Sequence, residues 1–228
     1  MRYLRYQVFQ SLKAPFAEFS RRSRMKKFCQ KMAPHEGAKV LDLGGTAAIW
    51  AFVDTPLNIK ILNLPGSPMN KPPSVAHHNI EFVVGDATDL KEFEDGEFDI
   101  VFSNSVIEHV GGRGKQLAFA EEVKRLAPAY WVQTPSIWFP IEAHSGMPFW
   151  FFYPRAVRNW FMARWSQKLP AWTEMVRQTR VLKHIALRFL FHDGHIDREW
   201  SFLMVKSYIA YKPRPQWRGD LRRRQSAA

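Results

Sequence analysis

The stretch VLDLGGTAAIW, residues 40–50, decides which kind of fold the chain can adopt. Its apolar residues, interrupted only by Asp42, lead into two glycines, which is the pattern of a buried strand that ends in a tight turn. Glycine at positions 44 and 45 permits a sharp turn and a close approach of a ligand to the backbone. The stretch lacks the full Gly-x-Gly-x-x-Gly spacing of a nucleotide-binding loop, so an ordinary strand–turn–helix connection remains open.

Further apolar runs follow along the chain. They are IKILNL (59–64), IEFVVGDATDL (80–90), FDIVFSNSVIEHV (98–110) and YWVQTP (130–135). Four of the gaps between strands can hold a helix, although the third gap is short, and buried strands that alternate with helices predict a mainly parallel, doubly wound α/β sheet. Two late runs, HIDREWSF (195–202) and VKSYIAYKP (205–213), predict an antiparallel hairpin at the sheet edge.

Composition limits the function classes. The chain has 228 residues with 46% hydrophobic residues, and its single cysteine excludes a disulfide framework and a cysteine-rich zinc site. No apolar run reaches the roughly 18 residues of a membrane helix, and no secretory signal is visible, so we expect a cytoplasmic protein. The net charge of +12 favours an anionic contact, which is a nucleic acid, a lipid surface or a phosphorylated substrate; a solvated helix face and a frayed tail explain the charge equally well.

The chain divides into three predicted parts. Residues 1–37 form a basic helical cap, residues 38–212 form the main domain with an aromatic-rich insertion at about 135–190, and residues 213–228 form a basic, disordered tail. Phenylalanines at helical spacing favour a packed N-terminal cap over an amphipathic helix on a membrane surface. Within the insertion we predict helices over 154–165 and 173–190.

Polar residues follow the ends of four successive predicted strands. They are Asp42, Asn63, Asp86 and the pair Ser103–Asn104. Because parallel strands end at the same sheet edge, these residues are expected to line one crevice, which is where doubly wound folds bind ligands.

These motifs, in this order, resemble the class I S-adenosylmethionine-dependent methyltransferase superfamily. VLDLGGTAAIW resembles its glycine-rich first motif, VVGDATDL its adenine-contacting motif and FDIVFSNSVIEHV its fourth motif, and the resemblance spans about residues 40–212. It implies a Rossmann-like seven-stranded sheet with an antiparallel last strand, and S-adenosyl-L-methionine as cofactor.

The resemblance also implies binding roles by position. The implied contacts are Asp42, Gly44 and Gly45 for the amino-acid part with Thr46 in the same loop, Asn63 for the ribose, Asp86 and Ala87 for the adenine, and Ser103 and Asn104 near the sulfonium. The family usually carries an acid at the Asn63 position and often a glycine at the Thr46 position, so the chain departs from the pattern twice.

The acceptor side is predicted from TPSIWFPIEAHSGMPFWFFYP, residues 134–154. This segment resembles the TP…FPIE-H…P segment of a bacterial group of such enzymes. Glu142 and His144 are the catalytic candidates, because a histidine can take a proton from a hydroxyl and a nearby carboxylate can orient it. The alternative is that both side chains only hold a proline-rich loop in place.

Glu108 and His109 form a second pair. Two interpretations are open: the pair has a structural role, or His109 is a catalytic base. A single Glu-His pair is thin support for a metal site, and we predict no bound metal. The insertion is dense in aromatic residues, and four explanations for them are open. They fill a core, they form an apolar acceptor pocket, they contact a lipid surface together with the basic N-terminal helix, or they stack on nucleic-acid bases. The favoured function is O-methylation of a small, sugar or lipid-linked glycan acceptor. The alternatives are an RNA methyltransferase and a non-catalytic scaffold at a membrane or partner protein.

Overall fold

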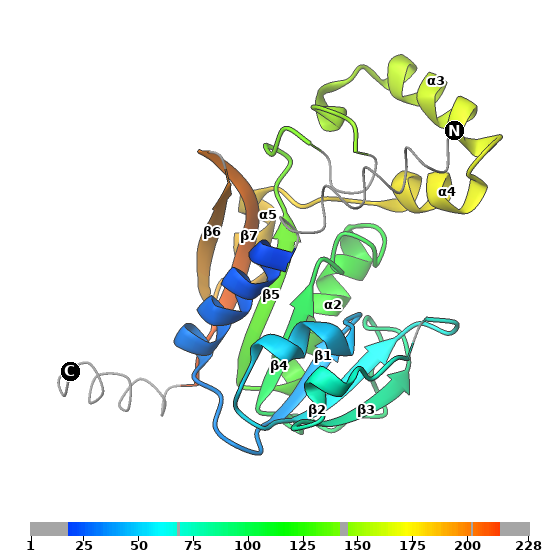
Figure 1. The fold of residues 1–228 in the computed structure, drawn as a ribbon. Coiled ribbons are helices and arrows are strands. Elements are labelled where there is room, and N and C mark those ends of the chain that lie inside the picture. The colour runs from blue at the N-terminus through cyan, green and yellow to red at the C-terminus, as the bar shows by residue number, and fades with distance from the viewer. Residues whose placement is uncertain (1–17, 68, 142–145, 202, 215–228) are drawn as a thin grey trace.

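A seven-stranded sheet organises the computed structural model of the protein, which describes residues 18–67, 69–141, 146–201 and 203–214 (Figure 1). The strands are β1 (Lys39–Leu43), β2 (Asn58–Asn63), β3 (Asn79–Val84), β4 (Ile100–Asn104), β5 (Ala129–Pro135), β6 (His195–Ser201) and β7 (Met204–Lys212). Their order in the sheet is β3-β2-β1-β4-β5-β7-β6. The first five strands are parallel, and β7 is antiparallel to both β5 and β6. The predicted fold class is therefore confirmed. The carboxyl ends of β1 to β5 lie along one edge of the sheet, which we call the carboxyl edge.

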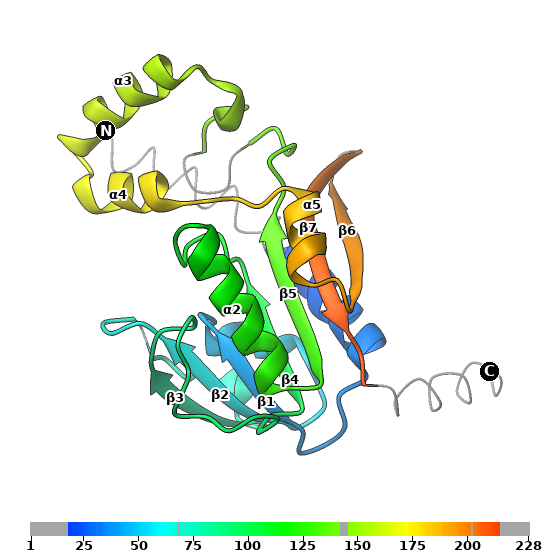
Figure 2. The same cartoon turned by 180° about the vertical axis from the view of Figure 1, so that it is seen from behind.

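Helices cover both faces of this sheet. The helix over residues 18–32 and the 3₁₀ helix η1 (Ala47–Phe52) lie on one face (Figure 1). The opposite face carries α2 (Arg113–Leu126) and α5 (His184–Leu190), as Figure 2 shows. Among the described helices, none is long and apolar enough to cross a membrane.

The connections between the parallel strands differ from the predicted helices. The gap between β1 and β2 holds only η1, and the next gap holds only the single-turn η2 (Pro73–Val75). Residues 85–99 between β3 and β4 form turns, and α2 is the one α-helix described in these connections. Pro72 and Pro73 restrict the backbone ahead of β3, and the short β3–β4 connection is folded into a turn by Asp86 and Thr88.

The helix over residues 18–32 belongs to the core of the sheet. The ring of Phe28 lies edge-on to Trp50, Phe102 and Trp131 at centroid distances of 5.9, 5.4 and 5.7 Å. All four side chains are fully buried. Edge-to-face contacts of this kind add to the free energy of area burial, so the aromatic cluster anchors this helix on the sheet.

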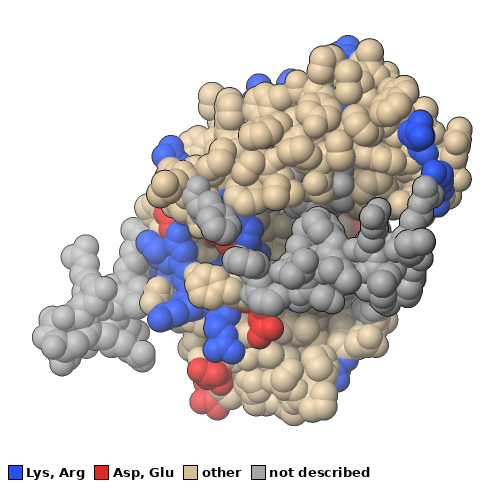
Figure 3. Space-filling view, turned by 45° about the horizontal axis from the view of Figure 1, so that its top comes forward, with Lys and Arg blue, Asp and Glu red and all other residues tan. Residues whose placement is uncertain are grey.

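The insertion forms a second cluster beyond the carboxyl edge. We call this cluster the cap; it is distinct from the N-terminal helical cap predicted for residues 1–37. It consists of η3 (Trp150–Phe152), α3 (Arg155–Ser166) and α4 (Pro170–Gln178). Its small core is built on Trp150, Met162 and Val176. In Figure 3 the visible face of the cap is mostly tan, with lysines and arginines at its rim.

The single helix predicted over 173–190 is wrong, because the structure divides it into α4 and α5. Residues 179–183 between them are not helical. The sheet and the helices that cover it, which we call the body, take up their backbone groups. The Arg180 amide donates to the Glu108 carbonyl at 2.7 Å, and Gln116 Nε2 donates to the Arg180 carbonyl at 2.8 Å. These two bonds replace helical ones and fix the cap to the loop after β4 and to α2.

Candidate functional site

The turn after β1 is built around the carboxylate of Asp42. A Cβ at position 45 would lie 1.9 Å from Asp42 Oδ2, and one at position 44 would lie 2.5 Å from Val106 Cγ2. Gly44 also has a φ of +71°, which side chains rarely adopt. Both glycines are therefore required by the protein's own packing, and their presence alone does not identify a ligand site.

Asp42 itself points to a ligand more directly. Its side chain is fully buried, and Oδ2 accepts a hydrogen bond from Trp50 Nε1 at 2.9 Å. Within the described part of the chain, Oδ1 is buried and has no hydrogen-bond partner. Burial raises the pKa of Asp42 to about 7, against the opposing effect of the Trp50 bond. A buried carboxyl oxygen without a donor is suited to receive a proton or a cationic group.

Asn63, at the end of β2, is bonded to the same turn. Its Nδ2 donates to the Gly45 carbonyl at 3.0 Å. An ionised carboxylate, which is acceptor-only, could not make this bond, so the departure from an acid at this position has a structural role. Thr46 follows in the turn, where its backbone is extended ahead of η1 and its side chain is exposed.

Asp86, after β3, lies at the same edge. Its Oδ1 accepts from the Thr88 amide at 2.9 Å and from the Thr88 hydroxyl at 2.8 Å, and Oδ2 lies 3.3 Å from Lys115 Nζ. Burial raises the pKa of Asp86, but the Thr88 bonds and Lys115 outweigh it, so the pKa is lowered and the group is an anion at neutral pH. Ala87 beside it is buried.

The end of β4 contributes three successive polar residues. Ser103 is buried, with Oγ 3.4 Å from the Leu43 carbonyl. The amide oxygen of Asn104 accepts from Arg24, so this side chain is turned toward the helix over residues 18–32. Ser105 adopts a φ of +59°, and its hydroxyl donates to Gln133 at 2.8 Å. A non-glycine residue in this conformation is a strained position of the kind that gathers at functional sites.

Arg24 was not predicted as a site residue. Its guanidinium is nearly buried and contacts both carboxylate oxygens of Glu199 on β6, at 2.8 and 3.1 Å, in addition to Asn104. Its neighbours Lys27 and Lys31 both face Asp197 of the same strand. In the sequence these three residues are part of one undifferentiated basic run, and only their helical spacing sets Arg24 on the same side as Phe28.

His109 and Glu108 follow β4 and face the cap. Thr179 Oγ1 lies 3.4 Å from His109 Nδ1, and the buried Glu108 carboxylate accepts from the Thr134 hydroxyl at 3.0 Å. Glu142 and His144 lie outside the described residues. In the part of the chain that is described, no group of three or more His, Cys, Asp or Glu side chains is placed to hold a metal ion.

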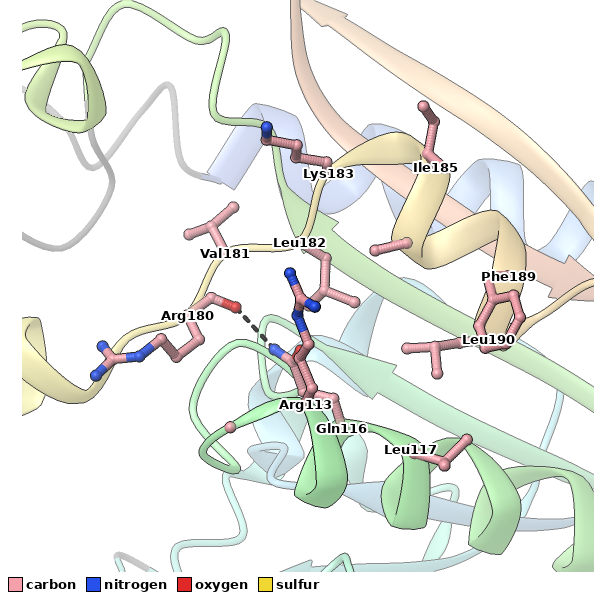
Figure 4. Close-up of a pocket in the computed structure, with 12 residues that line it drawn as sticks. Arg113, Gln116, Leu117, Arg180, Val181, Leu182, Lys183, Ile185, Phe189 and Leu190 are labelled. Atoms are coloured by element: carbon pink, nitrogen blue, oxygen red, sulfur yellow. Dashed lines mark hydrogen bonds between the residues drawn. The ribbon is translucent and has the colours of Figure 1, made fainter.

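The larger of two described hollows lies away from the glycine turn. It has a volume of about 890 Å³ and runs between α2 and α5, with Leu117, Ile185 and Phe189 among its walls (Figure 4). Figure 4 shows that the Arg180 side chain points away from this groove, while its carbonyl holds Gln116. The predicted cofactor residues Asp42, Asn63 and Asp86 do not line it.

Comparisons with known proteins bear on the fold and on one segment of the chain. Residues 64–128 match the family model described as a methyltransferase domain. This segment begins directly after β2, ends before β5, and includes Asp86, Ser103, Asn104 and His109. No curated protein matches the chain.

Solved structures share the fold at low sequence identity. The PH0226 protein from Pyrococcus horikoshii OT3 is 17% identical with a TM-score of 0.52, covering 92% of this chain and 91% of its own. A chain in the complex between the Haloferax volcanii Trm112 methyltransferase activator and a putative methyltransferase is 17% identical with a TM-score of 0.51, covering 92% and 94%. The N-terminal domain of EvdMO1, crystallised in the presence of SAH and D-fucose, is 15% identical with a TM-score of 0.52, covering 85% and 82%. The protein therefore has the class I methyltransferase fold, and its segment 64–128 matches a methyltransferase domain.

Proposed function

We propose that the protein is an S-adenosyl-L-methionine-dependent methyltransferase that modifies a hydroxyl group of a small, sugar or lipid-linked acceptor. The observation that carries this proposal is the buried Asp42 carboxyl beneath the Gly44–Gly45 turn, with one oxygen that has no partner among the described residues. This arrangement stands at the end of β1, in a fold and beside a segment that match methyltransferases.

The residues of the carboxyl edge fit the proposed cofactor. S-adenosylmethionine supplies an activated methyl group on a positively charged sulfonium. Asp42 offers a buried acceptor for its amino group, and the oxygen of the Asn63 amide is suited to a ribose hydroxyl while its nitrogen holds the turn. Asp86 is an anionic acceptor for the adenine amino group, which would take the place of Lys115 at Oδ2. Ala87 is a small apolar neighbour for the adenine ring.

The protein's contribution to the reaction is positioning and proton removal. The strand ends hold the binding groups at one edge, and orientation of the two reactants lowers the entropic part of the barrier of a displacement reaction. His109, with Nδ1 facing the Thr179 hydroxyl, is proposed to accept the proton that the acceptor hydroxyl loses. Glu142 and His144 remain predicted partners in this step.

Calorimetric titration with S-adenosylmethionine and S-adenosylhomocysteine tests the cofactor site. We expect micromolar binding that weakens at least tenfold in Asp86→Ala, because the charged acceptor is lost. Asp89→Ala is the matched control: Asp89 is an exposed acid three positions away, its side chain pairs only with the exposed Lys91 among the described residues, and its backbone bond to Asp86 is kept in the variant. Absence of binding to the folded protein would contradict the proposal.

The same experiment separates the alternatives. A non-catalytic scaffold would bind neither compound. An RNA methyltransferase would bind both, and would also bind RNA with a steep dependence on salt concentration. The pairing of Arg24, Lys27 and Lys31 with acids of β6 removes part of the basic charge on which an RNA function would draw.

A further inference from the structure

A second hollow lies in the cap, between α3 and α4. Its volume is about 450 Å³. Its walls are Trp150, Phe151, Arg158, Asn159, Met162, Ala163, Val176, Arg177, Thr179 and Arg180. Three of these are arginines and none is an acid, so the described walls carry positive charge only. Like charges that share a pocket repel each other, and an anionic ligand relieves that repulsion.

Arg158 is the arginine of this pocket that most clearly lacks a partner. Its Nε–H is buried, and among the described residues nothing accepts a hydrogen bond from it. The Arg158 residue as a whole is only half-buried, but a buried donor without an acceptor is costly, and an anion that accepts from this Nε–H would remove that cost. The guanidinium is well matched to this, because its donors form a planar fork that fits phosphate or carboxylate oxygens.

The other two arginines have weaker partners. Arg177 pairs with Glu174 at 3.1 Å, and both side chains are about half exposed. Arg180 donates to the backbone carbonyls of Arg177 and Thr179, which are neutral. Neither arrangement neutralises the charge of Arg158. The exposed Arg177–Glu174 pair contributes little free energy, so a ligand that displaces Glu174 from Arg177 would lose little.

The remaining walls indicate an organic ligand. Trp150, Met162 and Val176 are nearly buried apolar side chains, and Asn159 adds an amide. A ligand that carries both an anionic group and an apolar or ring-shaped part would satisfy the two halves of this surface.

The pocket adjoins the proposed proton acceptor. Thr179 is one of its walls and also lies 3.4 Å from His109 Nδ1. Arg180, another wall, is fixed to the Glu108 carbonyl at 2.7 Å. Thr179 and Arg180 therefore connect the pocket to the loop after β4, where methyl transfer is proposed.

We infer that the α3–α4 pocket is a subsite for an oxyanion, a phosphate or a carboxylate, carried by the methyl acceptor. This inference rests on the proposed methyltransferase function and narrows its acceptor to anionic molecules. Arg158 is the central contact, with Arg177 and Arg180 at the sides of the same pocket.

Calorimetric titration with phenyl phosphate, benzoate and benzyl alcohol tests the inference. At least one anion is expected to bind in a saturable way, and the neutral alcohol, which has the same ring, is not. Arg158→Gln is expected to weaken anion binding at least tenfold, because a charge-assisted bidentate contact is lost. Arg155→Gln is the matched control: it removes the same charge from the same helix at an exposed position outside the pocket, and its effect is expected to stay within about twofold.

Two results would overturn the inference: neither anion binds, or Arg158→Gln and Arg155→Gln lose the same affinity. Titration of both variants with S-adenosylhomocysteine separates this failure from that of the proposed function. Intact S-adenosylhomocysteine binding without anion binding rejects the subsite and keeps the methyltransferase. Arg158-dependent anion binding without S-adenosylhomocysteine binding keeps an anion site and rejects the methyltransferase acceptor.

Discussion

The body and the cap use the same residue types in opposite ways. In the body, Phe28 and Trp50 are fully buried, and Arg24 is matched by both oxygens of Glu199. In the cap, Phe152 is about half exposed, and the buried Nε of Arg158 has no partner among the described residues. Phe28 and Arg24 are packed and paired on the sheet, whereas Phe152 and the Arg158 Nε in the cap are not.

This contrast separates stability from ligand binding. Groups that are fully packed and paired contribute to the free energy of folding, and their loss is felt as unfolding. Groups that are buried without partners are retained at a cost in stability, which natural proteins accept at functional sites. Phe28 and Arg24 should therefore respond to mutation mainly through stability, and Arg158 mainly through binding.

The largest expected effect is at the aromatic cluster. Phe28→Ala should lower the free energy of unfolding by about 3–5 kcal/mol, because the buried ring contacts three other aromatic side chains. Phe152→Ala should lower it by about 1 kcal/mol or less, since that ring is 53% exposed. Urea unfolding of the two variants measures the difference, and equal losses would remove the distinction between body and cap.

The two arginines give the next largest contrast. Arg24→Met should destabilise the protein by about 3 kcal/mol, because Glu199 would keep a largely buried charge without its cationic partner, and the neutral Ser207 hydroxyl would not compensate for it. Arg158→Gln should change the free energy of unfolding by about 1 kcal/mol at most, or stabilise the fold, since it removes an unmatched charge. Thermal unfolding of both variants, with the wild type alongside, is the measurement; a large loss in Arg158→Gln would show that the residue is structural.

Asp42 links the body to pH. Its folded pKa of about 7 lies above the value near 3.8 expected when unfolded, so the folded state holds a proton that the unfolded state has released. Its contribution to stability is therefore full below about pH 4 and is lost as the pH rises to 7. Between pH 5 and 8 the wild type should lose roughly 2–3 kcal/mol more than Asp42→Asn. Denaturant unfolding at both pH values tests this, and parallel pH profiles would show that the Asp42 pKa is not raised.

The smallest of these effects concerns the glycine turn. Asn63→Asp installs the acid that the family usually carries, yet it should weaken S-adenosylhomocysteine binding by about tenfold, because the donor to the Gly45 carbonyl is replaced by a repelling oxygen. Asn58→Asp, on the same strand but at its opposite end, serves as the control. Tighter binding by Asn63→Asp would mean that charge at the ribose position outweighs the bond to the turn.

Much of the sheet was predictable because its signals are local. Each of the first four parallel strands is an apolar run that ends at or just before a polar residue or glycine, and β5 ends at Pro135. The hairpin of β6 and β7 follows from two adjacent runs with a short connection. The positions of Asp42, Asn63 and Asp86 at one edge follow from parallel pairing alone. These features depend on pattern and topology, which a single sequence contains.

The remaining features depend on partners that are distant in the sequence. Arg24 and Glu199 are 175 positions apart, and nothing in the basic run distinguishes Arg24 from its neighbours. The break between α4 and α5 arises because Gln116 and Glu108 bind the backbone of Arg180, which competes with helix propensity. The pocket around Arg158 is likewise formed by tertiary packing of α3 on α4, and the sequence shows only a helix with arginines.

The place of β7 between β5 and β6 affects how the chain must fold as it is synthesised. Ile209 and Tyr211 of β7 belong to the same core cluster as Phe28 and Trp131, so this cluster cannot close until the ribosome has produced almost the whole described chain. Until then the apolar side of the helix over residues 18–32 lacks its final neighbours and is open to other apolar surfaces. The pairing of β5 with β7 joins residues about 80 positions apart, and non-local pairing of this kind slows folding because the loop must close before the contacts form.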